Sequence, residues 1–119
     1  MRRKSGALIP LEVSILEASA EVRRSGQAEV HGYELAKVVR DLRHARRLTA
    51  YGTLYKALNR LERQGYLASR WEEPQIAADE GRPRRRFYRL TLEGEIALNE
   101  ARAEARRTSA GRAAAATVE

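Results

Sequence analysis

"LTAYGTLYKALNRLERQGYL", residues 48–67, decides the fold because its leucines recur at the spacing of a helix. Leu54, Leu58 and Leu61 stand at positions i, i+4 and i+7, which predicts one apolar face turned toward a core. Gly65 is placed to end this helix as a C-terminal glycine. The opposite face carries aromatic, amide and basic side chains, so the function depends on what that second face touches.

Two further helices are predicted before this stretch. Apolar residues recur at helical spacing from about 8 to 24, where Pro10 is tolerable in a first turn. A second helix is predicted from about 32 to 44, with four apolar residues at i, i+3, i+4 and i+7. Residues 27–30 between them predict a short connection or a stub of strand.

The second half of the chain predicts a hairpin and a last helix. "YLASRWEE" and "RRRFYRLT" are rich in aromatic and aliphatic residues and alternate loosely, as strands do. The connection "PQIAADEGRP" is too long for a tight turn and predicts a projecting loop. Thr91 can cap a helix from Leu92 to about Arg107.

Three helices, a two-stranded hairpin and one more helix are the outline of a winged helix-turn-helix, a mainly α fold with a small β-hairpin. We expect a flexible N-terminus over residues 1–7, a winged-helix domain over 8–91, a C-terminal dimerisation helix over 92–108 and a disordered tail over 109–119.

The charge balance favours a polyanionic partner. Lysine and arginine outnumber aspartate and glutamate 23 to 16 in 119 residues, which gives a formal charge of +7. A merely well-solvated basic surface is the alternative explanation. The chain has no cysteine, which agrees with a reducing cytoplasm, and no segment approaches the roughly 20 apolar residues of a membrane span.

The outward face of the helix within residues 48–67 predicts contacts with DNA. At about 100° per residue, the outward or bordering positions are Tyr51, Tyr55, Lys56, Asn59, Arg60 and Arg63. Side chains near the helix start can hold phosphates, and those further along can read base edges in the major groove. The candidate base readers are Lys56, Asn59 and Arg60, and the candidate phosphate contacts are Tyr51, Thr53 and Tyr55.

Arginines follow the predicted hairpin tip without any acidic residue between them. They would repel one another unless an anion such as a phosphate backbone lay nearby. Arg82, between Gly81 and Pro83, suits insertion into a narrow minor groove. The alternative is that some arginines pair with acidic residues of the strand opposite, where Glu72 or Glu73 could face Arg84 or Arg86. The five arginines are Arg82, Arg84, Arg85, Arg86 and Arg89.

Three motifs in this order resemble the PadR family of transcriptional regulators: "HGYELAK", "GTLYKALNRLERQGYLASRWEE" and "GRPRRRFYRLT". The resemblance covers roughly His31 to Gly94. It implies a winged helix-turn-helix that dimerises through its terminal helices and represses promoters. By this match the DNA-reading helix supplies Tyr51, Thr53, Tyr55, Lys56, Asn59 and Arg60, and the wing supplies Arg82, Arg84 and Arg85.

A two-fold dimer would place two reading helices about 34 Å apart and require an inverted repeat in the operator. The last helix is the candidate seam, because its alanines at i, i+4 and i+8 permit close approach. The alternative is that this helix covers only the core of its own domain. The predicted interface comprises Leu8, Leu11, Ile15, Leu92, Ile96, Ala97, Ala101 and Ala105.

No pattern in the sequence predicts an enzyme, a metal site or a cofactor. The two histidines, His31 and His44, lie apart and lack partners at metal-ligand spacing. No nucleophile elbow or phosphate loop is present. We therefore expect a sequence-specific regulator that binds double-stranded DNA as a homodimer, with room for an unknown small-molecule effector. The rival hypotheses are a winged helix that binds an acidic protein and a small basic RNA-binding protein.

Overall fold

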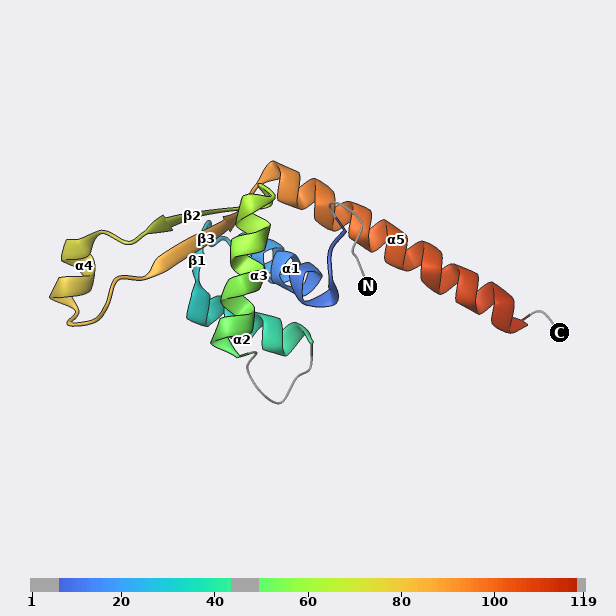
Figure 1. Ribbon diagram of the computed structural model, residues 1–119, viewed down its shortest axis with the longest axis horizontal. Coiled ribbons are helices and arrows are strands. Elements are labelled where there is room, and N and C mark those ends of the chain that lie inside the picture. The colour runs from blue at the N-terminus through green and yellow to red at the C-terminus, as the bar shows by residue number, and fades with distance from the viewer. Residues whose placement is uncertain (1–6, 44–49, 118–119) are drawn as a thin grey trace.

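Helices and short strands alternate along the chain in the computed structural model, which describes residues 7–43 and 50–117. The first three helices form a body. The sheet, with a short helix in the wing at its far end, extends to one side of this body, and the last helix extends to the other (Figure 1). This confirms the mainly helical winged fold. The elements are α1 (Pro10–Arg24), β1 (Val30–His31), α2 (Gly32–Leu42), α3 (Tyr51–Arg63), β2 (Leu67–Trp71), α4 (Pro74–Asp79), β3 (Arg86–Leu90) and α5 (Leu92–Thr117).

The core lies between α1, α2, α3 and the inner face of the sheet. The three leucines that predicted the inward face of α3 are fully buried there, as expected. α1 contributes Ile15 and Leu16, α2 contributes Leu35 and Val39, and the sheet contributes Tyr88. Burial of these side chains holds α3 on the body while its opposite face stays in solvent.

The end of α3 and the start of α2 follow from local chemistry. Gly65 has φ +82° and lets the chain turn out of α3, while the Tyr66 amide donates to the Leu61 carbonyl at 2.9 Å. His31 is the N-cap of α2, and its Nδ1 accepts a hydrogen bond from the Glu34 amide at 3.4 Å.

The sheet has three antiparallel strands in the order β1–β3–β2. The predicted hairpin is present, with Leu67 opposite Leu90 and Trp71 opposite Arg86. The prediction of a two-stranded sheet was incomplete, because Val30 also pairs with Tyr88. A two-residue strand is too short to show the alternation by which strands are found in a sequence.

Two segments are more helical than expected. The connection after β2 contains the short helix α4, which begins with Pro74 at its first turn, so the prediction of a plain loop was wrong. α5 continues to Thr117 instead of ending near Arg107. Residues 109–117 of the expected disordered tail are therefore helical. Alanine has the highest helix propensity, and this run of alanines needs no large apolar anchor. Of the segment 1–7 that was expected to be flexible, residues 1–6 lie outside the described part of the chain.

Candidate nucleic-acid interface

The outer face of α3 is an exposed row of polar side chains. Thr53, Lys56, Asn59 and Arg63 all face solvent, at positions separated by three or four residues. One side of a helix can present these groups together to a groove of DNA. Tyr51 begins α3, but its side chain lies outside the described part of the structure.

Tyr55 stands at the border of this face and leans toward the start of α2. A Cβ on Gly32 would lie 2.6 Å from the Tyr55 hydroxyl oxygen, so the absence of a side chain at Gly32 makes room for the ring. The whole Tyr55 residue is 37% exposed. The phenol is therefore positioned between the body and the outer face, as the predicted border position requires.

Arg60 was predicted to face outward, but its side chain turns toward α1 instead. Its Nε lies 3.5 Å from Oε2 of Glu12 on α1, and its Nη2 donates to the Ala7 carbonyl at 3.3 Å. The Arg60 side chain is 18% exposed. At the edge of the apolar stripe, a long arginine side chain reaches a buried carboxylate on the neighbouring helix, which helical periodicity alone cannot reveal.

A hollow of about 930 Å³ separates the start of α3 from the wing. Tyr55 and Asn59 line it from α3, Trp71 from β2, and Arg84 and Arg85 from the segment before β3. The hollow thus brings together residues from both predicted DNA-contacting elements. Its aromatic and cationic lining suits a sugar-phosphate strand between them.

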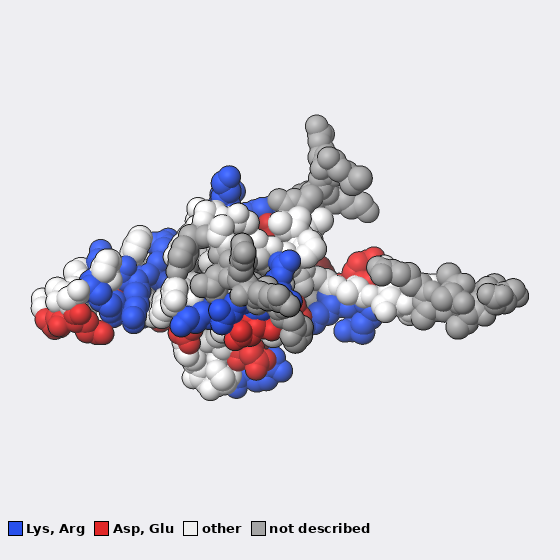
Figure 2. Space-filling model, turned by 90° about the horizontal axis from the view of Figure 1, so that it is seen from below, with Lys and Arg blue, Asp and Glu red and all other residues white. Residues whose placement is uncertain are grey.

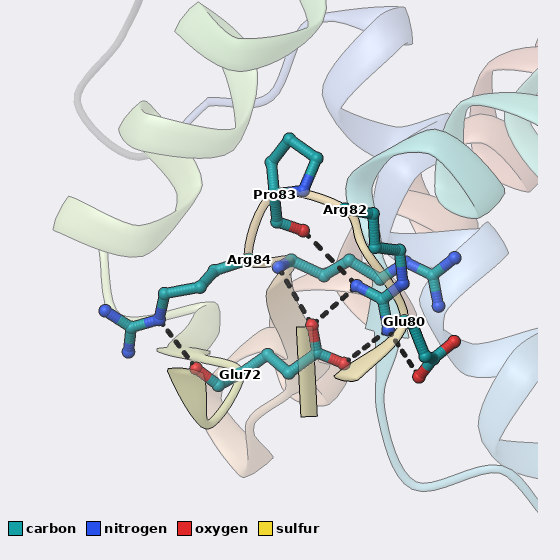
Figure 3. A network of polar contacts seen from close by, with 6 residues as sticks. Glu72, Glu80, Arg82, Pro83 and Arg84 are labelled. Atoms are coloured by element: carbon teal, nitrogen blue, oxygen red, sulfur yellow. Dashed lines mark hydrogen bonds and ion pairs between the residues drawn. The ribbon is translucent and has the colours of Figure 1, made fainter. Parts of the chain in front are cut away.

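The wing arginines fall into two groups (Figure 3). Arg82 turns inward: its Nη1 and Nη2 donate to the two carboxylate oxygens of Glu72 at 2.6 and 2.8 Å, and Nη2 also donates to Glu80 at 3.1 Å. Its side chain is 20% exposed. The predicted minor-groove arginine is therefore the centre of an ion-pair network within the wing.

Arg84 and Arg85 are the outward group. Both residues are exposed, while the backbone beside them is hydrogen bonded to Glu72. The Arg84 guanidinium lies 5.7 Å from the centre of the Trp71 ring, and Arg86 stacks on the same ring at 5.0 Å. Arg86 also lies 3.5 Å from Glu62, so it connects the wing to α3. The predicted pairing of Glu72 thus involves Arg82 rather than Arg84 or Arg86 through its carboxylate.

The arrangement shifts the pKa values of Glu72 and His31. Hydrogen bonds from Arg82 lower the pKa of Glu72 to about 2, so its carboxylate is ionised throughout the physiological range. Burial, reinforced by the charge of Arg85, lowers the pKa of His31 below its usual value. His31 is therefore neutral near pH 7, which lets Nδ1 accept the hydrogen bond that caps α2.

Lysine and arginine side chains gather over the wing and across the neighbouring face of the body (Figure 2). Acidic side chains lie at the outer tip of the wing and in a cluster at the centre of the same view. Asp79 at the end of α4 and Glu80 in the turn after it are both exposed. The basic surface is thus concentrated between the wing tip and the body.

The terminal helices place the predicted interface residues unequally. Ile15 is fully buried in the core of its own domain, so the prediction that it lines a dimer seam was wrong. Leu8 and Leu11 are partly buried against the core. Leu92 and Ile96 are 65% and 51% exposed at the start of α5. Ala97, Ala101 and Ala105 line a groove of about 680 Å³ together with Leu8, Val13 and Tyr66.

A sequence profile of the transcriptional regulator PadR-like family matches residues 25–100, which is more than half of the chain. The chain belongs to this PadR-like family. No curated protein matches the sequence.

Solved structures of transcriptional regulators, among them members of the PadR family, have a similar fold. The PadR-like chain is 27% identical to a transcriptional regulator of Clostridium thermocellum, with a TM-score of 0.67 over 92% of this chain and 90% of that one. A PadR family regulator of Eggerthella lenta is also 27% identical, with a TM-score of 0.66 and coverage of 88% and 82%. Bacillus subtilis PadR, solved in complex with operator DNA, shares the fold at 17% identity and a TM-score of 0.59 over 79% of this chain and 47% of that one.

The PadR-like regulator carries no membrane-spanning helix among its described residues, since none there is long and apolar enough. Within the same described ranges, no three histidine or acidic side chains gather where they could hold a metal ion. The sequence does not reveal the roles of two residues at the site. Nothing in it indicates the contact of Glu12 with Arg60, and Glu72 is indicated only by its position opposite the arginines.

Proposed function

We propose that this PadR-like regulator acts in the cytoplasm as a repressor, binding an inverted-repeat operator as a homodimer. The observation that carries the proposal is the exposed polar row of α3 beside the outward arginines of the wing, with the hollow between them. A rigid helix with amide and amine groups matches the donor and acceptor pattern of the major groove. The operator complex of Bacillus subtilis PadR supports the same use of a shared fold.

The side chains take different roles in this proposal. Asn59 and Lys56 contact base edges, because they project from the middle of the outer face of α3. Thr53 and Tyr55, together with Tyr51, bind phosphates near the helix start, where the backbone amides and the helix dipole favour anions. Arg84 and Arg85 bind phosphates from the wing.

Arg60 and Arg82 take indirect roles in this proposal. Each guanidinium already lies against a carboxylate of its own chain, and each side chain is at most one-fifth exposed. Releasing either arginine toward DNA would leave a carboxylate that is nearly inaccessible to water without its cation. We therefore assign both to the geometry of the DNA-binding face rather than to contacts with bases.

The proposed dimer uses α5 and the groove beside it. Ala97, Ala101 and Ala105 recur every four residues and leave space for the backbone of a second helix to approach. Leu92 and Ile96 add exposed apolar area at the start of α5, which a partner can cover. A two-fold axis through this groove gives the paired reading helices that an inverted repeat requires.

The test is binding of the purified protein to the DNA upstream of its own gene, measured by fluorescence anisotropy at several salt concentrations. Tight binding that survives an excess of unrelated duplex, with a steep dependence on salt, is expected of a sequence-specific regulator. Equal displacement by unrelated duplex DNA, duplex RNA and heparin would contradict sequence-specific recognition and favour the acidic-protein or RNA hypotheses.

A further inference from the structure

Glu72 is buried within the wing, although most of the residues around it in the sequence are exposed. The residue is 5% exposed, whereas its neighbours Trp71 and Glu73 face solvent. Both of its carboxylate oxygens accept hydrogen bonds from Arg82, and Oε1 also accepts one from the Arg85 amide at 3.3 Å. A buried carboxylate with these partners fixes the chain segments that carry them.

The hydrogen bonds of Glu72 extend over the whole turn that leads into β3. Its backbone amide donates to the Arg85 carbonyl at 2.8 Å, and its backbone carbonyl accepts from Nε of Arg84 at 2.8 Å. Arg82, Arg84 and Arg85 are thereby all connected to one residue, as Figure 3 shows for the first two.

The geometry separates the arginine that binds Glu72 from those that face solvent. Arg82 presents its planar guanidinium to both oxygens, an arrangement that arginine can make and lysine cannot. Arg84 is bonded through Nε only to a backbone carbonyl, and its terminal nitrogens lie beside the exposed ring of Trp71. Arg85 is held through its backbone, so its exposed side chain keeps its donors for another partner.

We propose that Glu72 is a positioning residue for DNA binding, which holds Arg84 and Arg85 toward the phosphate backbone through Arg82 and the wing turn. This inference rests on the proposed function. Held side chains lose less conformational freedom when they bind phosphate, so the fixed turn favours binding.

The inference predicts an effect opposite in sign to that of charge alone. Replacing Glu72 by glutamine raises the net charge from +7 to +8, and a more positive surface should bind DNA more tightly if only charge mattered. If Glu72 positions the arginines, the same change weakens binding. Glu73→Gln is the matched control, because it changes the charge equally at an exposed neighbour.

The experiment measures binding of the full chain to a labelled duplex of unrelated sequence across a range of salt concentrations. Glu72→Gln is expected to bind about tenfold more weakly than the unmodified chain, and its salt slope should fall by about one to two, the loss of one or two phosphate contacts. Glu73→Gln should bind equally well or better. Thermal unfolding, followed by circular dichroism, should show both variants folded at the binding temperature.

A variant that keeps both the net charge and Glu72 itself tests the contact between Glu72 and Arg82 from the other side. Arg82→Lys keeps the net charge but loses the two-pronged contact, so weaker binding and a lower salt slope are expected again. The inference would be overturned if Glu72→Gln bound DNA as tightly as Glu73→Gln does and if Arg82→Lys left the salt slope unchanged. The proposed function would remain intact in that case. Failure of the unmodified chain to bind any duplex would overturn the proposed function and this inference with it.

Discussion

Arg60 of α3 lies against Glu12 of α1, with 3.5 Å between Nε and Oε2, and the Glu12 side chain is 1% exposed. The same carboxylate accepts a hydrogen bond from the Ile9 amide at 3.0 Å, at the start of α1. One buried acidic group therefore connects the helix proposed to read DNA with the helix beside the proposed dimer groove. The contact adds a polar connection between α1 and α3 to the burial of the leucines of α3 in the core.

Arg60→Met should destabilise the fold by about 2–4 kcal/mol, because the buried carboxylate of Glu12 would lose the guanidinium beside it. The free energy of unfolding in urea gives the measurement. Arg63→Met is the control, since Arg63 lies one turn further along α3 and faces solvent. Its effect should stay within about 0.5 kcal/mol. Equal effects of the two substitutions would show that the contact with Glu12 contributes little.

Asn59→Ala and Arg84→Ala should weaken DNA binding in different ways. Asn59 is placed to read base edges, so its loss should reduce discrimination between operator and mutated operator by about 1–3 kcal/mol. Arg84 is placed to bind phosphate, so its loss should weaken all duplexes alike and lower the salt slope by about one. Competition binding with both duplexes measures each quantity. A uniform loss for both variants would refute the division of roles.

The sequence predicted the order of the elements and the inward face of α3 because these depend on local periodicity. Leu54, Leu58 and Leu61 were placed in the core by spacing alone, and the structure buries all three. β1 and α4 were missed or left open, because a two-residue strand and a six-residue helix are too short for a periodic signal. The predicted end of α5 near Arg107 is too early, because the alanines after it sustain a helix without a periodic apolar face.

The site was predicted less completely, since side-chain partners distant in the sequence decide it. Arg60 and Arg82 occupy positions that periodicity and turn chemistry assigned to the surface. Each is turned inward by a carboxylate, Glu12 at a separation of 48 residues and Glu72 at a separation of ten. No local pattern reports such a pairing, whereas the exposed positions of Lys56 and Asn59 follow from the helix alone.

Gly94→Ala should destabilise the fold strongly. A Cβ at this position would lie 2.1 Å from the Tyr66 carbonyl oxygen and 2.8 Å from Cδ1 of Leu90, and the backbone atom cannot move aside easily. We expect a loss of about 2–3 kcal/mol in the free energy of unfolding. Gly111→Ala is the control within α5, where a Cβ would meet nothing within 4 Å. It should be neutral or stabilise by up to about 1 kcal/mol. Similar values for both glycines would contradict the close contact of α5 with Tyr66.

Ala101→Arg should dissociate the proposed dimer, because a long charged side chain would fill the groove lined by the alanines of α5. Sedimentation velocity at micromolar concentration should give twice the 13.4 kDa chain mass for the unmodified protein and the single-chain mass for the variant. Asn99→Arg adds the same charge about 200° around the helix at an exposed position and should leave the mass unchanged. A single-chain mass for the unmodified protein would refute the dimer.

Stability should decrease as the pH falls through 6.5, because burial and Arg85 lower the pKa of His31 in the fold. At a pH between the usual pKa of histidine and the lower pKa in the fold, the imidazole is protonated in the unfolded chain and neutral in the folded chain. Lowering the pH through this range therefore favours unfolding. Protonation would also convert Nδ1 from the acceptor that caps α2 into a donor. Urea unfolding from pH 8 to pH 5 measures the loss.

His31→Asn separates this titration from other acid effects. Asparagine is a good N-cap and does not titrate, so the variant should keep the helix start and lose the part of the pH dependence that begins near 6.5. Arg85→Gln should raise the pKa of His31 toward its usual value, measured by the NMR chemical shifts of the imidazole, because the charge of Arg85 is the second cause of the shift. A His31 pKa at or above 6.5 in the unmodified protein would refute the lowered pKa and the loss of stability expected from it.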